Sequence, residues 1–255
     1  VLEYYERARQ LICVERSTVQ PIDTRWNSDG MARTVESELR VEFEITDGES
    51  LPEAHVSREV LRVNGREPRE RDRMSRAGCT DPNPISPEPL TFLLPGYRDA
   101  YTFSAVRATR HQDRQALIIE FKSANRIGRP RLIEDDQGRE DCFDWEGDTP
   151  VKGRLWVDAS TYDVLKLERH LAGPTDIAVP LPLQRKYGFP AWITIDRDDL
   201  TLDYREVTFS DPDEVLVLPH SIIRTLILRS SLQSTRRTQQ FTGYQRFLTN
   251  SRIKN

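Results

Sequence analysis

The feature that most constrains this sequence is an alternation of apolar and polar side chains with a period of two. It is clearest in residues 38–45, where every second side chain is apolar: Leu39, Val41, Phe43 and Ile45. Such a segment forms a β-strand with one buried and one solvated face. The pattern recurs in residues 101–107, 115–121, 151–158, 163–169 and 199–209. The sequence therefore predicts a mainly β (α+β) chain of about ten strands.

These strands are not interleaved with helices in a repeated βα order, so one large antiparallel sheet is the expected arrangement. A sheet of this size twists and curls, which predicts a half-open β-barrel. Neither an internal repeat nor a Gly/Ser-rich linker divides the 255 residues. We therefore expect residues 1–255 to form a single half-barrel domain.

Three segments are candidates to cover the concave face of this sheet. Apolar residues in 1–15 have helical spacing and predict an N-terminal helix. The run Leu90–Leu94 predicts a short helical plug, and residues 177–183 predict a flap that packs on the core. These covers are too few to fill the concavity, so the sequence predicts a partly lidded apolar groove suited to a long apolar ligand.

Large apolar side chains on the predicted strands and covers are the candidates to line that groove. They are Phe43, Phe92, Phe103, Phe121 and Tyr204. Packing within a closed core explains each of them equally well, so the sequence leaves both interpretations open.

The formal net charge of −4 argues against bulk nucleic-acid binding. The charge is unevenly distributed, because residues 221–255 contain Arg and Lys but no Asp or Glu, whereas residues 134–148 are rich in acids. The basic segment either folds beside the acid-rich stretch or presents a basic surface to anionic lipid headgroups or an acidic partner. The candidate residues of that surface are Arg229, Arg236, Arg237 and Arg246.

The cysteines indicate an oxidising compartment. Cys79 and Cys142 lie in polar, irregular stretches, and a disulfide between them would close a long loop. We expect Cys79–Cys142 to form, with Cys13 free and buried, and three reduced thiols in a cytosolic protein are the alternative. Because the first residue is Val1, we expect a chain from which a signal peptide was removed. No apolar run approaches the ~18 residues of a membrane-spanning helix, so contact with a membrane is expected to be peripheral at most.

The sequence contains none of the common catalytic or cofactor motifs. It has no nucleophile elbow, phosphate-binding loop or dinucleotide fingerprint, and the four histidines are isolated from one another. The acid-rich residues 134–148 could hold Ca²⁺ through oxygen ligands but lack the register of an EF-hand loop. We expect no catalytic residue, no metal and no cofactor.

One hairpin is similar to a known family. Gly153-Arg154-Leu155-Trp156-Val157-Asp158, followed by Thr161 and Val164–Glu168, resembles a motif of the bacterial outer-membrane lipoprotein-sorting (LolA/LolB-like) superfamily. Residues 63–73, Leu218-Pro219 and residues 241–247 resemble uncharacterised secreted acidobacterial proteins related to it. The resemblance implies a curled half-barrel with helices as a lid, and a periplasmic carrier or binder of acyl chains or another apolar ligand.

Three functions follow from these features. The first is a non-catalytic periplasmic or secreted protein that binds a lipid-like or acyl-chain ligand in the concave face. The second is an envelope module that binds a protein partner through its basic C-terminal strands. The third is a hydrolase that uses dispersed residues or a metal in the acid-rich stretch. This hypothesis is supported only by the density of Asp and Glu near Cys142.

Overall fold

The computed structural model describes residues 4, 7, 8, 10–44, 53–69, 90–124, 128–134, 143–229 and 232–246. The first strands are β1 (Gln10–Ile22), β2 (Arg33–Glu44), β3 (Glu53–Val63), β4 (Tyr101–His111), β5 (Arg114–Ser123), β6 (Arg131–Glu134) and β7 (Phe143–Glu146). The others are β8 (Val151–Asp158), β9 (Val164–Leu171), β10 (Thr175–Ala178), β11 (Trp192–Ser210), β12 (Asp213–Arg229) and β13 (Ser234–Arg246). The helical elements are η1 (Thr91–Leu93), α3 (Pro95–Arg98) and α4 (Leu181–Tyr187).

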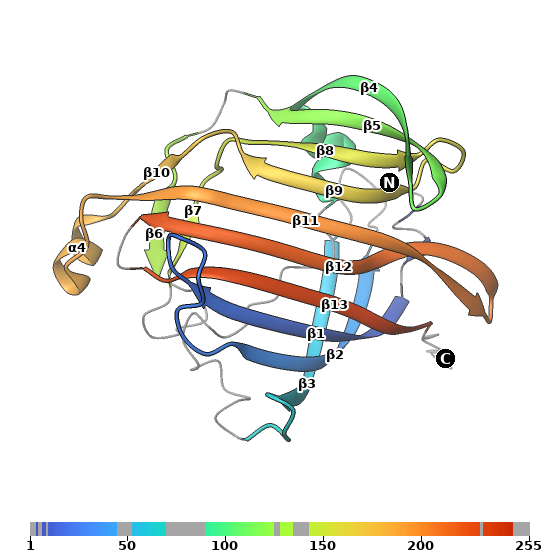
Figure 1. Cartoon of the computed structure of the whole chain (residues 1–255), viewed down its shortest axis with the longest axis horizontal. Coiled ribbons are helices and arrows are strands. Elements are labelled where there is room, and N and C mark those ends of the chain that lie inside the picture. The colour runs from blue at the N-terminus through green and yellow to red at the C-terminus, as the bar shows by residue number, and fades with distance from the viewer. Residues whose placement is uncertain are drawn as a thin grey trace, which may run out of the picture.

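The strands of the described residues form one 13-stranded sheet, ordered β3-β2-β1-β13-β12-β11-β9-β8-β5-β4, with β10, β6 and β7 attached off this path. The last strand, β13, pairs with the first, β1, so the first and last strands lie side by side in the middle of the sheet (Figure 1). The pairs along the path are antiparallel, while β10 and β6 share one parallel bridge. Strands β3 and β4 are separate edges that do not pair with each other in the described structure. The predicted curled, half-open antiparallel sheet is thus confirmed.

The predicted N-terminal helix is wrong from Gln10 onward. A helical turn precedes this point, where the amide of Ala8 donates to the carbonyl of Tyr4 at 2.8 Å. From Gln10 the chain is strand, and its burial alternates along most of β1. The apolar residues that suggested helical spacing, such as Leu11 and Val14, fit either period over so short a stretch. Pairing with β2 on one side and β13 on the other decides for strand, because the backbone groups of β1 then find hydrogen-bond partners on both sides.

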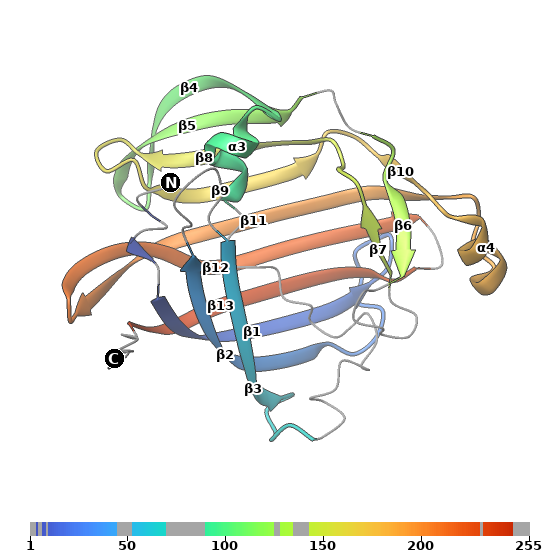
Figure 2. The same cartoon turned by 180° about the vertical axis from the view of Figure 1, so that it is seen from behind.

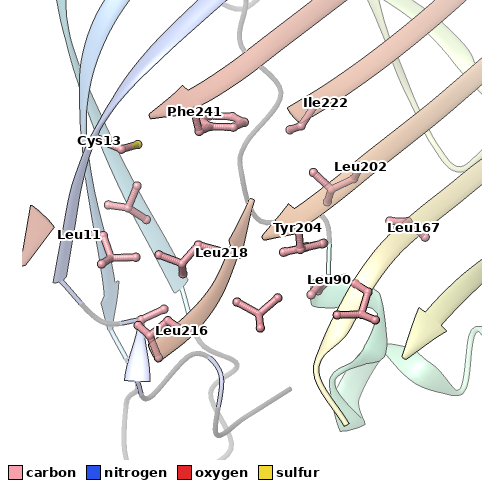
Figure 3. Packing of buried hydrophobic residues seen from close by; sticks show 14 of the residues in the cluster. Leu11, Cys13, Leu90, Leu167, Leu202, Tyr204, Leu216, Leu218, Ile222 and Phe241 are labelled. Atoms are coloured by element: carbon pink, nitrogen blue, oxygen red, sulfur yellow. The ribbon is translucent and has the colours of Figure 1, made fainter. Parts of the chain in front are cut away.

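Leu90 and the segment η1–α3 form a plug on the inner face of the sheet. Figure 2 shows α3 in front of β8 and β9, on the face toward which β2 and β3 curl. Leu90 and Leu94 are almost fully buried in an apolar cluster with side chains of β1, β2, β5, β8, β9, β11, β12 and β13. Figure 3 shows side chains of this cluster, among them Cys13, Leu11, Leu90 and Leu167, directed toward a common interior. The predicted docking of Leu90–Leu94 on the core is confirmed.

A second apolar cluster lies at the other end of the inner face. There Ile193 and Ile195 of β11 pack with residues of β6, β8, β9, β10, β12 and α4. Ile177 and Val179 of the predicted flap are buried in this cluster, so the flap packs on the core as expected, although Leu181 is 63% exposed. Figure 2 shows the β6–β7 hairpin crossing in front of β11 and β12 at this end. None of the helices in the described residues is long and apolar enough to cross a membrane.

Candidate functional site

Charged side chains interrupt the apolar rows of the inner face between the two clusters. On β9, Leu165 and Leu167 belong to the first cluster and Leu171 to the second, and Arg169 occupies the inward position between them. Because side chains of a strand alternate between the two faces, Arg169 faces inward with its leucine neighbours. Along the inner face of β9, the side chains before and after Arg169 are thus apolar.

The neighbouring strands repeat this arrangement at the same level of the sheet. On β12, Arg224 lies between Ile222 of the first cluster and Leu228 of the second. On β11, a bulge between Ile195 and Arg197 shifts the alternation by one residue. The bulge turns Asp198 inward, where it is only 4% exposed. Three strands therefore bring Arg169, Asp198 and Arg224 together in one charged layer.

Asp198 and Arg224 form a bidentate ion pair within this layer. The guanidinium of Arg224 donates from Nε to Oδ1 of Asp198 at 2.6 Å and from Nη2 to Oδ2 at 3.0 Å. Burial by itself would raise the pKa of Asp198, but the charge and hydrogen bonds of Arg224 outweigh it and hold that pKa below its usual range. Both carboxylate oxygens of Asp198 are thus committed to Arg224.

Arg169 is the residue of the charged layer whose hydrogen-bond donors are not all paired. Its Nη2 lies 3.8 Å from Oδ2 of Asp198, which is too long for a hydrogen bond. Within the described residues its Nε is buried without a hydrogen-bond partner. Burial lowers the pKa of Arg169, and the charge of Asp198 opposes this only in part. The layer therefore contains a guanidinium with unused donors.

The charged layer is the floor of a cavity of about 540 Å³ on the inner face. Its walls come from the link between α3 and β4, the end of β5, strand β7, the link from β7 to β8 and the start of β8. Besides Arg169, Asp198 and Arg224, the lining residues are Asp99, Ala100, Tyr101, Ser123, Ala124, Asp144, Trp145, Gly147, Asp148, Thr149 and Val151. This volume lies within the range of small-molecule binding sites.

The charge of the cavity changes sign between floor and mouth. We use "floor" for Arg169, Asp198 and Arg224, and "mouth" for the exposed carboxylates Asp99, Asp144 and Asp148. On the floor, two guanidiniums face a single carboxylate. The ring of Trp145, which follows Asp144 in the chain, has its centroid 5.8 Å from Cζ of Arg224. The cavity thus has two guanidiniums on its more buried side and three exposed carboxylates, and one of these, Asp144, is close enough to act on the pKa of Arg224.

Three of the predicted groove residues, Phe92, Phe103 and Phe121, pack together next to a wall residue of this cavity. The ring of Phe121 packs on Phe92 and on Phe103, with centroids 4.9 and 6.4 Å apart. Phe92 also packs on Tyr101, a wall residue of the cavity, at 5.1 Å. Phe121 is buried and Phe103 is 41% exposed.

The two remaining groove candidates lie on other strands. Tyr204 is buried in the first cluster on β11. The backbone of Phe43 is in β2, opposite Ala54, and its side chain lies outside the described residues.

The four predicted basic-surface residues are dispersed along β12 and β13, with Arg229 and Arg246 at opposite ends of this antiparallel pair. Arg229 pairs with Asp196 at 2.5 Å, and Arg246 pairs with Glu214. Arg236 is exposed and Arg237 is half-buried on β13, where Arg237 lies directly opposite Arg224. The acids that neutralise this segment therefore come from β11 and β12. Burial lowers the pKa of Arg224, but the charge and hydrogen bonds of Asp198 raise it by more. The charge of Asp144, from the acid-rich residues 134–148, adds to this rise.

Cys13 is a free, buried thiol, as predicted. Burial and then the charge of Glu15 raise its pKa to about 12. Cys79 and Cys142, the predicted disulfide partners, lie outside the described residues, as does most of the acid-rich stretch. In the part of the chain that is described, no group of three or more His, Cys, Asp or Glu side chains is placed to hold a metal ion.

The charged floor was not predicted, although its signal is present in the sequence. A charged residue stands at an inward position of an otherwise apolar alternation in Leu165-x-Leu167-x-Arg169-x-Leu171 and in Ile222-x-Arg224-x-Leu226-x-Leu228. What the pattern of either strand alone does not reveal is that Arg169 and Arg224 both lie opposite Leu200 of β11, one inward position from Asp198.

Comparison with protein-family models gave no match to this chain, and comparison with curated proteins gave none. Among solved structures, the chain is similar to an outer membrane lipoprotein-sorting protein domain from Vibrio parahaemolyticus. The alignment covers 99% of this chain and 92% of that chain, with 10% sequence identity and a TM-score of 0.38. Because a structural similarity at this level does not indicate function, the function of the chain is inferred from its own cavity.

Proposed function

We propose that this chain is a non-catalytic binding protein that holds a lipid-like or acyl-chain ligand on the inner face of its curled sheet. One observation carries the proposal. A cavity of about 540 Å³ opens on this face between two apolar clusters, in the gap that the plug and the β6–β7 hairpin leave uncovered. Tyr101, Trp145 and Val151 supply apolar surface to its walls, next to the polar groups that orient a ligand.

Uptake of a fluorescent fatty-acid probe by delipidated protein tests this function. The wild type should bind the probe saturably. Ala124→Trp, which places a large side chain in the cavity wall, should weaken binding by at least about tenfold, equivalent to about 1.4 kcal/mol. Ala108→Trp is the matched control, because Ala108 is exposed on β4 and does not line the cavity. If the wild type takes up no probe, or if both variants bind equally, the proposal is wrong.

We further propose a periplasmic or secreted location for a single domain of residues 1–255. The motif in residues 153–168, which resembles the lipoprotein-sorting superfamily, supports the location, and the kinship with secreted acidobacterial proteins stays a prediction. Osmotic-shock fractionation of cells that express the tagged gene should release the protein with periplasmic markers. Calorimetry should show one cooperative unfolding transition, whereas two transitions would contradict a single domain.

The alternative of an envelope module with a basic docking surface has less support. Arg229 and Arg246 are already paired with Asp196 and Glu214, so half of the candidate cations are neutralised within the chain. Salt-sensitive capture of an envelope protein that is lost in an Arg236→Glu variant would favour this alternative.

A further inference from the structure

Arg169 has no hydrogen-bonded counter-ion in the described residues, and its Nε is buried without a partner although its side chain is 35% exposed. The carboxylate of Asp198 instead accepts hydrogen bonds from Arg224 at both of its oxygens, at 2.6 and 3.0 Å. The remaining contact between Arg169 and Asp198 is 3.8 Å long. Buried charged groups are normally paired, since removing a charge from water without compensation is costly.

The free donors of Arg169 belong to the lining of the cavity. On the floor the two guanidiniums exceed the single carboxylate by one positive charge, and the other acids that line the cavity are the exposed Asp99, Asp144 and Asp148. An oxyanion that enters the cavity would supply this missing counter-charge. A guanidinium binds phosphate or carboxylate oxygens through two parallel N–H donors, which makes such an ion the fitting ligand.

The mouth selects for the opposite charge. Asp99, Asp144 and Asp148 are exposed, and among the described lining residues no Lys or Arg accompanies them on this side. The face of an aromatic ring attracts cations, and Trp145 directly follows Asp144 and lines the same cavity as Asp148. Exposed carboxylates act more weakly than the buried floor because water screens them. The mouth therefore adds a preference for an ammonium group outside the oxyanion.

Resting on the proposed binding function, we propose that the cavity recognises a zwitterionic head group. Its oxyanion, a phosphate or carboxylate, binds the guanidinium of Arg169 at the floor. Its ammonium group faces Asp144, Asp148 and Trp145 at the mouth. The source of this head is either an amphiphile or a free soluble zwitterion, and the two differ only in whether an alkyl chain is attached.

Isothermal titration calorimetry with probes of one chain length tests the proposal. Dodecylphosphocholine, dodecyl phosphate and dodecyltrimethylammonium, each below its micelle concentration, differ only in the head group. The expected order of affinity is zwitterion, then anion, then cation. Free phosphocholine, without a chain, forms the fourth arm and tests the soluble source.

Variants of the lining residues test which side chains cause the head-group preference. Arg169→Gln should weaken binding of dodecylphosphocholine and of dodecyl phosphate by about tenfold, equivalent to about 1.4 kcal/mol, and leave the cation unaffected. Arg154→Gln is the matched control, because Arg154 lies on the next strand, faces outward and pairs with Glu168. The double variant Asp144→Asn/Asp148→Asn should remove the advantage of the zwitterion over the anion. Thermal unfolding verifies that each variant is folded, and the ranking of heads on the wild type needs no variant.

The outcomes separate this inference from the function on which it rests. Equal binding of all three amphiphiles, or strongest binding of the cation, overturns the head-group inference and leaves the binding function standing. Binding of free phosphocholine without binding of any amphiphile or fatty-acid probe overturns the lipid-like ligand and supports the zwitterion site. If neither the amphiphiles nor phosphocholine binds, both proposals fall.

Discussion

Arg224 and Asp198 form a two-hydrogen-bond ion pair on the inner face of the sheet, with Nε–Oδ1 and Nη2–Oδ2 distances of 2.6 and 3.0 Å. The pair lies between two apolar clusters, where packed leucines would be the simpler choice for stability. A buried ion pair contributes little net stability, because the cost of removing both charges from water offsets their attraction. Its position at the base of a cavity, next to Arg169, whose donors are not all paired, fits a binding role better than a structural one.

Removing one member of this pair should be far more costly than breaking a surface pair. Asp198→Ala leaves Arg224 and Arg169 facing each other without a carboxylate, and we expect the free energy of unfolding to fall by about 3–5 kcal/mol. The control is Asp196→Ala, which breaks the pair between Asp196 and the exposed Arg229 and should cost no more than about 1 kcal/mol. Urea denaturation measures both, and equal losses would contradict a buried charged layer.

The turn between β8 and β9 depends on an ionised Asp158. Its Oδ1 accepts hydrogen bonds from the amides of Ser160 and Thr161 at 2.8 and 2.9 Å, and its Oδ2 pairs with Nε of Arg114 at 2.6 Å. Burial opposes ionisation, but the hydrogen bonds and the charge of Arg114 hold the pKa of Asp158 well below its usual range. Asp158→Asn should therefore destabilise the protein by about 1–3 kcal/mol at neutral pH.

The sign of the pH dependence follows from this lowered pKa. A carboxyl group whose pKa is lower in the folded state stabilises the fold above its unfolded pKa, and that stabilisation is lost as the pH falls. The difference between the wild type and Asp158→Asn should be largest at neutral pH and shrink below about pH 4. Chemical denaturation at several pH values measures it, with Asp163→Asn in the same turn as the control. A difference that stays constant with pH would show that the charge of Asp158 is not responsible.

Gly153 makes room for the packing of Phe121. A Cβ atom at Gly153 would lie 2.5 Å from Cζ of Phe121 and would also collide with the backbone oxygen of Glu168 on β9. Gly153→Ala should therefore lower the free energy of unfolding by at least about 2 kcal/mol, since the backbone of a paired strand cannot move aside freely. Gly173→Ala is the control, because no atom lies within 4 Å of the added Cβ there. Similar melting temperatures for the two variants would refute the close approach.

Cys13 should be chemically inert in the folded protein. It is about 1% exposed, and burial raises its pKa to about 12, so almost no reactive thiolate is present at pH 8. Iodoacetamide at pH 8 should leave the peptide that contains Cys13 unmodified without denaturant and modify it fully in urea. Peptide mapping by mass spectrometry distinguishes this cysteine from the other two. Rapid modification of the native protein would contradict its burial.

Local patterns were sufficient for much of the fold. Alternation of apolar and polar residues identified the strand that contains Leu39 and Val41, and the apolar run Leu90–Leu94 identified the plug. Both patterns are local, because the spacing of apolar residues shows which side chains are buried. The helix expected over residues 1–15 was the exception. There the short apolar pattern fits both periods, and the pairing of β1 with β13, more than two hundred positions later in the chain, is what makes it a strand.

The sequence by itself determined that this chain is a large antiparallel β protein with an inner apolar face. Successive side chains of a strand point to opposite faces, so apolar residues at every second position mark the face that is buried from solvent. Only the tertiary structure decided where the charges meet. Strand register places Arg169 and Arg224 opposite Leu200, and the bulge after Ile195 turns Asp198 inward at the next inward position of β11. Register depends on how strands from distant parts of the chain align, so the cavity floor exists only once the whole sheet has formed.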